Sequence, residues 1–254
     1  NLIRTYRNEE DEEDKKPTLP NLKGLNRFVW NMKYPGPAEK IDTSLEKKKY
    51  KALVRGEGGE QGGPTAIPGS YRAVLKYGRH EVSHNFKILK DPRLKTTPED
   101  YHTQFDLWLR IRERLSETNQ LINRLRRLRL EISIVLQRPE EKLDFSDTSI
   151  KHFKDSCELL IRKLDELEDE LVQTKNETPS DRLRHPMKLK DRLEGLISVV
   201  AISESSPPQQ TFDVFDHLNG LLKEQFSKMA GLESNELVVL KKLAKEANIQ
   251  MFQG

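Results

Sequence analysis

The chain has 254 residues, of which 33% are charged and 7% aromatic, and its 44 basic and 41 acidic residues give a formal net charge of +3. This length suffices for two ordinary domains, and the near balance of charge disfavours a dedicated binder of nucleic acid. One cysteine excludes a disulfide framework within the chain and a multi-cysteine zinc site, and no apolar run approaches the ~20 residues that span a bilayer.

The first ninety residues hold most of the glycines and show the polar–apolar alternation of strands. Residues 1–7, NLIRTYR, predict one strand, and the acidic run that follows, NEEDEEDKK, predicts a solvated loop rather than a calcium site. In NRFVWNMKY, residues 26–34, every second side chain is large and apolar. We expect a strand that faces a sandwich core, and an aromatic platform for a ligand is the alternative. Because the chain begins at Asn1 and has no signal-peptide pattern, we expect a fragment or processed piece.

A glycine-rich stretch, GEGGEQGGPTAIPG, predicts a flexible loop without the ending of a phosphate-binding P-loop. The next stretch, GSYRAVLKYGRHEVSHNFKIL, predicts a β-hairpin with a two-residue turn at Gly78-Arg79. The register that this turn imposes puts apolar residues opposite each other on one face: Tyr71 with Phe86, Ala73 with His84, and Leu75 with Val82. It also puts Lys76 opposite Glu81 on the other face.

The letters HEVSH, residues 80–84, have the spacing of a zinc protease motif, which requires a helix. On a strand, His80 and His84 would share a face but lie ~13 Å apart. Two ligands of one zinc ion each lie ~2 Å from the metal. We therefore predict no zinc site here, with His80 exposed beside the turn and His84 partly covered by Tyr71 and Phe86.

The period changes to that of helices after KDPRLKTTPED, where Thr97 is a plausible N-cap and Pro98 the first helical residue. Apolar residues then recur at steps of three, four and seven. The pattern predicts helices over Pro98–Gln137, Asp147–Lys175, Pro186–Ser203, Gln209–Met229 and Asn235–Ala247. Short connections between long helices favour an antiparallel bundle.

Seven arginines of the first helix spread around most of its surface: Arg110, Arg112, Arg114, Arg124, Arg126, Arg127 and Arg129. We favour ion pairs with the acidic second helix, on solvated flanks, over nucleic-acid binding. Asn119 and Asn123 lie one turn apart, and either a buried polar pair or solvent exposure would fit them. Cys157 lies on an apolar stripe and predicts a packed thiol.

Apart from HEVSH, no set of residues has the spacing of a catalytic triad, a metal site or a paired carboxylate acid and base. His102, His152, His185 and His217 have no partner at such spacing. We therefore predict no catalytic, cofactor-binding or metal-ligating residue and no cofactor, and we expect that this fragment is not an enzyme.

Four blocks, in this order, carry a resemblance to a known family: GLNRFVWNMKYPGP (24–37), AIPGSYRAVLKYG (66–78), residues 85–129, and residues 178–218. They resemble the C-terminal part of large bacterial sortilin-like β-propeller proteins with BNR (Asp-box) repeats, which are often labelled glycosyl hydrolases. The resemblance implies an Ig-like domain followed by helices, downstream of a propeller that this sequence does not contain, in a secreted, periplasmic or cell-envelope protein.

We therefore predict an α+β multidomain chain. Residues 1–94 would form a partial antiparallel Ig-like β-sandwich that lacks its first strand or strands, and residues 95–254 an antiparallel α-helical bundle, with the tail from about residue 231 left open. The predicted function is that of a non-catalytic accessory region, which supports the upstream β-propeller and offers a surface to a protein or glycan. The alternative is part of a glycoside hydrolase whose active site lies in the propeller.

Overall fold

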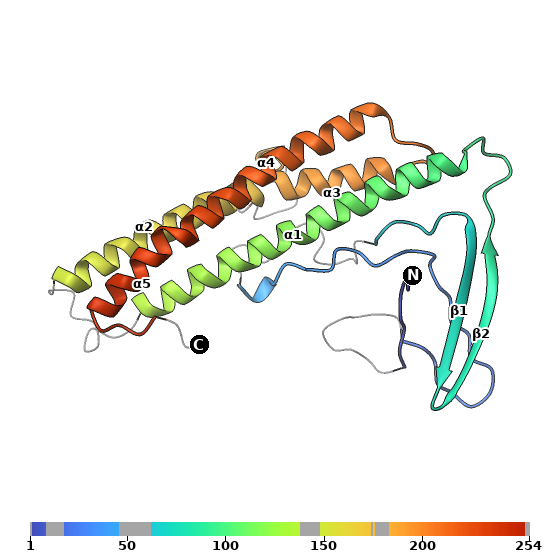
Figure 1. The fold of residues 1–254 in the computed structure, drawn as a ribbon, viewed down its shortest axis with the longest axis horizontal. Coiled ribbons are helices and arrows are strands. Elements are labelled where there is room, and N and C mark those ends of the chain that lie inside the picture. Colours follow the sequence, from blue (N-terminus) through green and yellow to red (C-terminus); the bar gives the residue numbers. More distant parts are fainter. Residues whose placement is uncertain are drawn as a thin grey trace.

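The structure, a computed structural model, describes residues 2–8, 18–45, 62–137, 148–173, 175 and 183–251. Its elements in chain order are the 3-10 helix η1 (Thr43–Leu45), the strands β1 (Gly69–Tyr77) and β2 (His80–Ile88), and the helices α1 (Pro98–Leu136), α2 (Thr148–Leu171), α3 (Leu189–Val200), α4 (Gln209–Ser234) and α5 (Glu236–Glu246). These residues form a helical bundle that carries one two-stranded antiparallel sheet (Figure 1).

The start of α1 follows from the residues predicted to cap it. Thr97 Oγ1 accepts a hydrogen bond from the Asp100 backbone N–H, and the Asp100 carboxylate accepts one from the Thr97 backbone N–H. This reciprocal arrangement satisfies two backbone donors that the first turn would otherwise leave unpaired. The Thr97 backbone N–H and the Thr97 hydroxyl both donate to the Asp100 carboxylate, and these two bonds hold the pKa of Asp100 below its ordinary value because they favour the charged form.

The helices lie in three rows, of which the middle one in chain order runs antiparallel to the other two. Helix α1 forms one row, α2 continued by α3 the second, and α4 continued by α5 the third (Figure 1). Helix α1 is long enough to contact α2, α3 and α4. Its first turns are fastened to the end of α3, because Gln104 Nε2 donates to the Val200 carbonyl at 2.6 Å and the Tyr101 hydroxyl donates to Glu204 at 3.0 Å.

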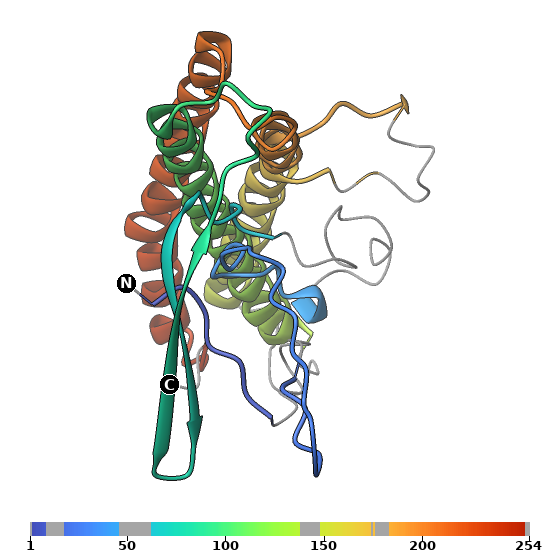
Figure 2. The ribbon, with the colours of Figure 1, turned by 90° about the vertical axis from the view of Figure 1, so that its right-hand side faces the viewer.

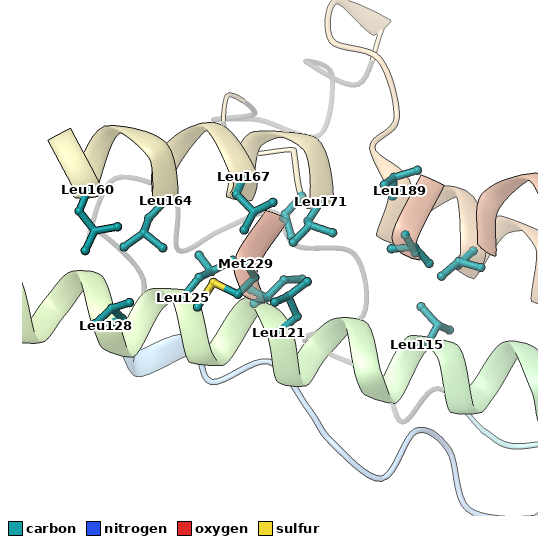
Figure 3. Close-up of a cluster of buried hydrophobic side chains, with 14 of the residues drawn as sticks. Leu115, Leu121, Leu125, Leu128, Leu160, Leu164, Leu167, Leu171, Leu189 and Met229 are labelled. Atoms are coloured by element: carbon teal, nitrogen blue, oxygen red, sulfur yellow. The ribbon is translucent and has the colours of Figure 1, made fainter. Parts of the chain in front are cut away.

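The rows bury one continuous apolar core, drawn in Figure 3. Leucines of α2 face leucines of α1 across the core, and Met229 of α4 lies between them. The fully buried side chains include Ile111, Leu115, Ile122, Leu125, Ile132, Phe153, Leu160, Leu164, Leu171 and Leu193. Each such side chain contributes roughly 1.5–3 kcal/mol by leaving water, so this core is the main source of stability. A helix occurs in each of the five predicted ranges, with different ends, and the helical part is compatible with the predicted bundle.

The hairpin has the predicted register. Tyr71 pairs with Phe86, Ala73 with His84, Leu75 with Val82 and Lys76 with Glu81. Gly78 has a φ of +56°, and Arg79 does not share the positive φ, which agrees with a turn that needs glycine at its first position only. The Lys76 ammonium lies 3.0 Å from the Glu81 carboxylate.

The predicted β-sandwich is wrong. Among the described residues, β1 and β2 form the one sheet, and no second sheet covers their apolar face. Residues 26–34 are not a regular strand, since only Lys33 makes an isolated bridge, to Thr65. The alternation fails at Met32, whose φ of +57° turns the backbone out of the extended conformation. Residues 2–7 form no strand either.

The backbone around that bridge is closely packed in place of a sheet. The Tyr34 N–H donates to the Pro64 carbonyl, and the Gly63 N–H donates back to the Tyr34 carbonyl. A Cβ atom at Gly63 would lie 2.0 Å from the Pro35 carbonyl oxygen, so only glycine fits this crossing. The predicted acidic and glycine-rich loops lie largely outside the described residues, which omit 9–17 and 46–61.

Candidate interaction site

The hairpin projects from the helices, with its turn at the far end (Figures 1 and 2). The apolar face of its outer half is open to solvent. Leu75 is 62% exposed, Tyr77 73% and Val82 67%. We call these three residues the hairpin tip. An isolated two-stranded hairpin is marginal in water, and clustered exposed apolar side chains mark contact surfaces.

The inner half of the same face is covered by aromatic packing. The Trp30 ring lies 6.2 Å from the Tyr71 ring and 6.3 Å from the Phe86 ring, and Tyr71 stacks on Phe86 at 5.8 Å. One residue pair links this cluster to the bundle, since the ring of Tyr34 meets that of Phe105 on α1 edge to face at 4.9 Å. Burial raises the pKa of both tyrosines above the ordinary value. The expected apolar role of the 26–34 segment is therefore met by a small cluster, without a sandwich core.

A row of polar side chains on α1 holds the segment that precedes η1. Four residues contribute, at positions i, i+4, i+7 and i+11, which share one face of the helix: Arg112, Ser116, Asn119 and Asn123. The sequence allowed either burial or solvent exposure for the two asparagines, and both are buried. We call these four residues the α1 clamp.

The α1 clamp binds mainly backbone atoms. The Glu39 N–H donates to Ser116 Oγ at 2.9 Å, and Asn119 Nδ2 donates to the Glu39 carbonyl at 2.9 Å. Asn123 Nδ2 donates to the Lys40 carbonyl at 2.7 Å, while Asn123 Oδ1 accepts from the Asp42 N–H at 2.8 Å. The clamp therefore supplies the hydrogen-bond partners that a neighbouring strand would otherwise provide to these backbone groups.

Two arginines that were predicted on solvated flanks lie inside the bundle, which corrects that prediction. Arg126 is 3% exposed, Arg129 5%, and both bind Glu168 of α2, which is 4% exposed. Arg126 Nε lies 2.6 Å from Glu168, and Arg129 Nη1 lies 2.7 Å from Asp165. Burial alone would lower the pKa of Arg129, but the charges and hydrogen bonds of Glu168 and Asp165 raise it above the ordinary value.

The HEVSH residues lie on β2, so their spacing is not that of a helical zinc motif. His80 is exposed, as predicted, but His84 is exposed as well, because no layer formed by the described residues covers the outer half of the hairpin. The other histidines named above lie on separate elements: His102 on α1, His152 on α2, His185 before α3 and His217 on α4. Within the described ranges, no group of three or more His, Cys, Asp or Glu side chains could hold a metal ion.

Two further features of the bundle bear on its chemistry, a buried thiol and a groove. Cys157 is fully buried, as predicted, and burial raises the pKa of its thiol to about 12, which suppresses the reactive thiolate. A groove of about 570 Å³ lies between α2, α4 and α5, where Lys163 pairs with Glu236 and holds the pKa of that carboxyl low. Neither feature brings a nucleophile to a base.

No helix in the described part of the chain is long and apolar enough to cross a membrane. Comparisons of the chain with models of protein families, with curated proteins and with solved structures find no match. The hairpin tip, its aromatic base and the α1 clamp are therefore interpreted from their own chemistry.

Proposed function

We propose that this chain is a non-catalytic accessory and interaction region of a larger β-propeller protein, and that the hairpin tip is its contact surface. The observation that carries the proposal is the exposure of Leu75, Tyr77 and Val82 together at the end of a projecting arm. Three apolar side chains in water at one place cost free energy that a partner surface recovers when it covers them.

The partner that we propose is the upstream β-propeller, or a protein or glycan that the propeller presents. The order of the four sequence blocks supports the propeller, because it resembles the C-terminal part of such proteins. Tyr77 offers an apolar ring with a polar hydroxyl, which suits either a protein or a glycan surface. The alternative, a glycoside hydrolase whose active site lies in the propeller, assigns this region the same supporting role.

The test uses the full-length gene, from which the propeller is expressed separately and titrated against this chain by calorimetry. We expect binding, and we expect the double variant L75S/V82S to bind at least tenfold more weakly. The matched control is Leu183→Ser, which removes a still more exposed leucine that precedes α3 and should bind like the wild type.

Four outcomes would contradict the proposal. Equal loss in both variants, or no binding at all, would remove the hairpin tip as the contact surface. Hydrolysis of a glycan or peptide by this chain, abolished by one carboxylate or histidine substitution, would overturn the non-catalytic assignment. Salt-dependent RNA or DNA binding that falls when Arg124 and Arg127 become alanine would favour a third class.

A further inference from the structure

The hairpin has a long outer edge on each of its two strands. Strands β1 and β2 pair with each other, and no backbone hydrogen bond from another described residue reaches the outer edge of either strand. Alternate N–H and C=O groups along each edge therefore face water, as at the edge of any sheet. A second extended chain is the one kind of partner that satisfies these groups in register.

The hairpin is also basic, in a nearly neutral chain. Its residues include four basic side chains (Arg72, Lys76, Arg79 and Lys87) against one acidic side chain, Glu81, so its formal charge is +3, as large as that of the whole chain. Glu81 is already paired with Lys76. Among the described residues Arg72 has no ion pair, and the residue opposite it is the neutral Asn85.

The two faces of β1 differ in their side chains. Arg72 and Lys76 lie on one face, four residues apart and with Val74 between them, whereas Tyr71, Ala73, Leu75 and Tyr77 lie on the other. β2 carries the acidic Glu81 on its charged face, with Lys87 as its only base there. The edge of β1 is therefore both the more basic edge and the one with the more continuous apolar face.

We propose that the outer edge of β1 binds an extended acidic segment of a partner protein as a third strand, with apolar side chains on one face and two acidic side chains, four residues apart, on the other. The acidic pair lies opposite Arg72 and Lys76, and the apolar residues extend the surface that begins at Leu75. This inference rests on the proposed function, because it names the chemistry of the partner that meets the hairpin.

Other occupants fit these observations less well. A second copy of this chain, paired through the same edge, would bring Arg72 and Lys76 close to their own copies, and like charges across a strand pair are destabilising. An anionic membrane or a nucleic acid would pair with the basic side chains. Either would leave the backbone edge without hydrogen-bond partners in register, and a nucleic acid would leave the apolar face wet as well.

The experiment uses the whole chain and a fluorescein-labelled peptide, GSVEVTVEVSG, whose two glutamates lie four residues apart. Binding is measured by fluorescence polarisation, and hydrogen–deuterium exchange reports which amides the peptide protects. We expect saturable binding that slows exchange in β1 more than in β2. A peptide with methylated backbone nitrogens at alternate positions should not bind, since it keeps the side chains but cannot complete the strand.

Three variants locate the edge. Arg72→Glu should weaken peptide binding about tenfold by replacing attraction with repulsion, and Arg72→Lys should restore it to within about twofold. Lys87→Glu is the matched control, because it makes the same charge change on the same face of the other strand, and it should stay within about twofold of the wild type. Circular dichroism checks that all three variants keep their helices.

Several results would overturn the proposal: no peptide binding at millimolar concentration, equal loss in Arg72→Glu and Lys87→Glu, or undiminished binding of the methylated peptide. Binding of phosphatidylserine vesicles or of poly(U) RNA that competes with the peptide would also overturn it, because the site would then be an unspecific anion surface. If the peptide fails while the propeller still binds through Leu75 and Val82, only the edge assignment fails and the proposed function stands.

Discussion

Glu168 shows how much one buried side chain decides. It is the shared acceptor of Arg126 and Arg129, and all three residues are almost fully buried between α1 and α2. Removing one member of a buried ion pair leaves charge without compensation in a medium of low polarity. We expect Glu168→Gln to lower the free energy of unfolding by about 3–5 kcal/mol, measured by urea denaturation monitored at 222 nm.

The neighbouring carboxylate provides the control for this substitution. Asp165 binds Arg129 at 2.7 Å, but its side chain is 39% exposed, so water can replace it. Asp165→Asn should therefore cost no more than about 1 kcal/mol. Equal costs for the two substitutions would mean that the arginines are hydrated in solution and that the pair is not a buried one.

Cys157 predicts a dependence of stability on alkaline pH. Burial raises the pKa of the folded thiol to about 12, from an unfolded value near 9.0, because the fold disfavours the thiolate. The neutral thiol is present in both states below pH 9, so its stabilisation is complete there and is lost as the pH rises from 9 towards 12. The loss should approach about 1.4 kcal/mol for each pH unit above 9.

Other groups titrate in the same pH range, so the contribution of Cys157 must be measured as the difference between the wild type and a variant without the thiol. The free energy of unfolding of Cys157→Val, determined by urea titration at pH 8 and pH 10.5, should fall less than that of the wild type. The wild-type thiol should also resist iodoacetamide at pH 8 and react once urea unfolds the chain. Rapid alkylation of the folded protein would show that the core opens at Cys157.

At the scale of elements, the α1 clamp is the link between the two halves of the chain. Asn123 is the sole described partner of the Asp42 N–H, at 2.8 Å, and also donates to the Lys40 carbonyl. Asn123→Ala should therefore speed hydrogen exchange of the Asp42 amide by about tenfold or more. Losing the bond between the Asp42 N–H and Asn123 Oδ1 leaves a polar group unsatisfied, which costs at least about 1.4 kcal/mol. Hydrogen exchange followed by NMR measures this rate.

Asn119→Ala is the matched substitution one turn away. It removes the bond to the Glu39 carbonyl but leaves the acceptor of the Asp42 N–H in place. The Asp42 amide should then exchange at nearly the wild-type rate. Equal acceleration by both variants would mean that the segment detaches from α1 as a unit, and that no single hydrogen bond controls it.

The elements that could be predicted are those whose signal is local. Apolar periodicity and the Thr97 cap give α1 from the sequence, and the turn at Gly78 gives the hairpin register. The absence of a sandwich could not be predicted, because alternation in residues 26–34 indicates which face is apolar but not what covers that face. One positive φ, at Met32, ends the extended run, and that depends on contacts with residues distant in sequence.

Part of the candidate site could likewise be predicted from the sequence, and part could not. The exposed tip follows from the hairpin register once no second sheet covers it, and the spacing of Asn119 and Asn123 already indicated a polar pair. Arg112 and Ser116 were missed, although the spacing of all four residues on one helical face was a usable signal. The burial of Arg126 and Arg129 could also have been suspected, since Glu168 falls between the buried Leu164 and Leu171 of α2.

At the scale of the whole molecule, the free energy of folding resides in the helices. The buried hydrophobic core comes almost entirely from α1–α5 and the residues directly after α2 and α5, and Ala66 is the one described residue before α1 among the fully buried apolar ones. The hairpin adds exposed apolar surface, and neither of its strands contacts a helix of the described bundle. The link to α1 lies in the preceding segment, where Tyr34 packs against Phe105. A part that contributes little to the core is retained for what it contacts, which agrees with a binding role.

This division gives a test of the whole arrangement. Gly69 and Ile88 are paired across the base of the hairpin, so a short Gly-Ser linker can replace residues 70–87 without moving either flank. Because the core of the bundle is untouched, the variant should keep its helical circular dichroism and its Tm should change by no more than about 2–4 °C, the effect of about 1 kcal/mol in a chain of this size. The same deletion should abolish binding to the propeller. A large fall in Tm would instead assign the hairpin a structural role, since it would mean that the aromatic cluster at its base stabilises α1.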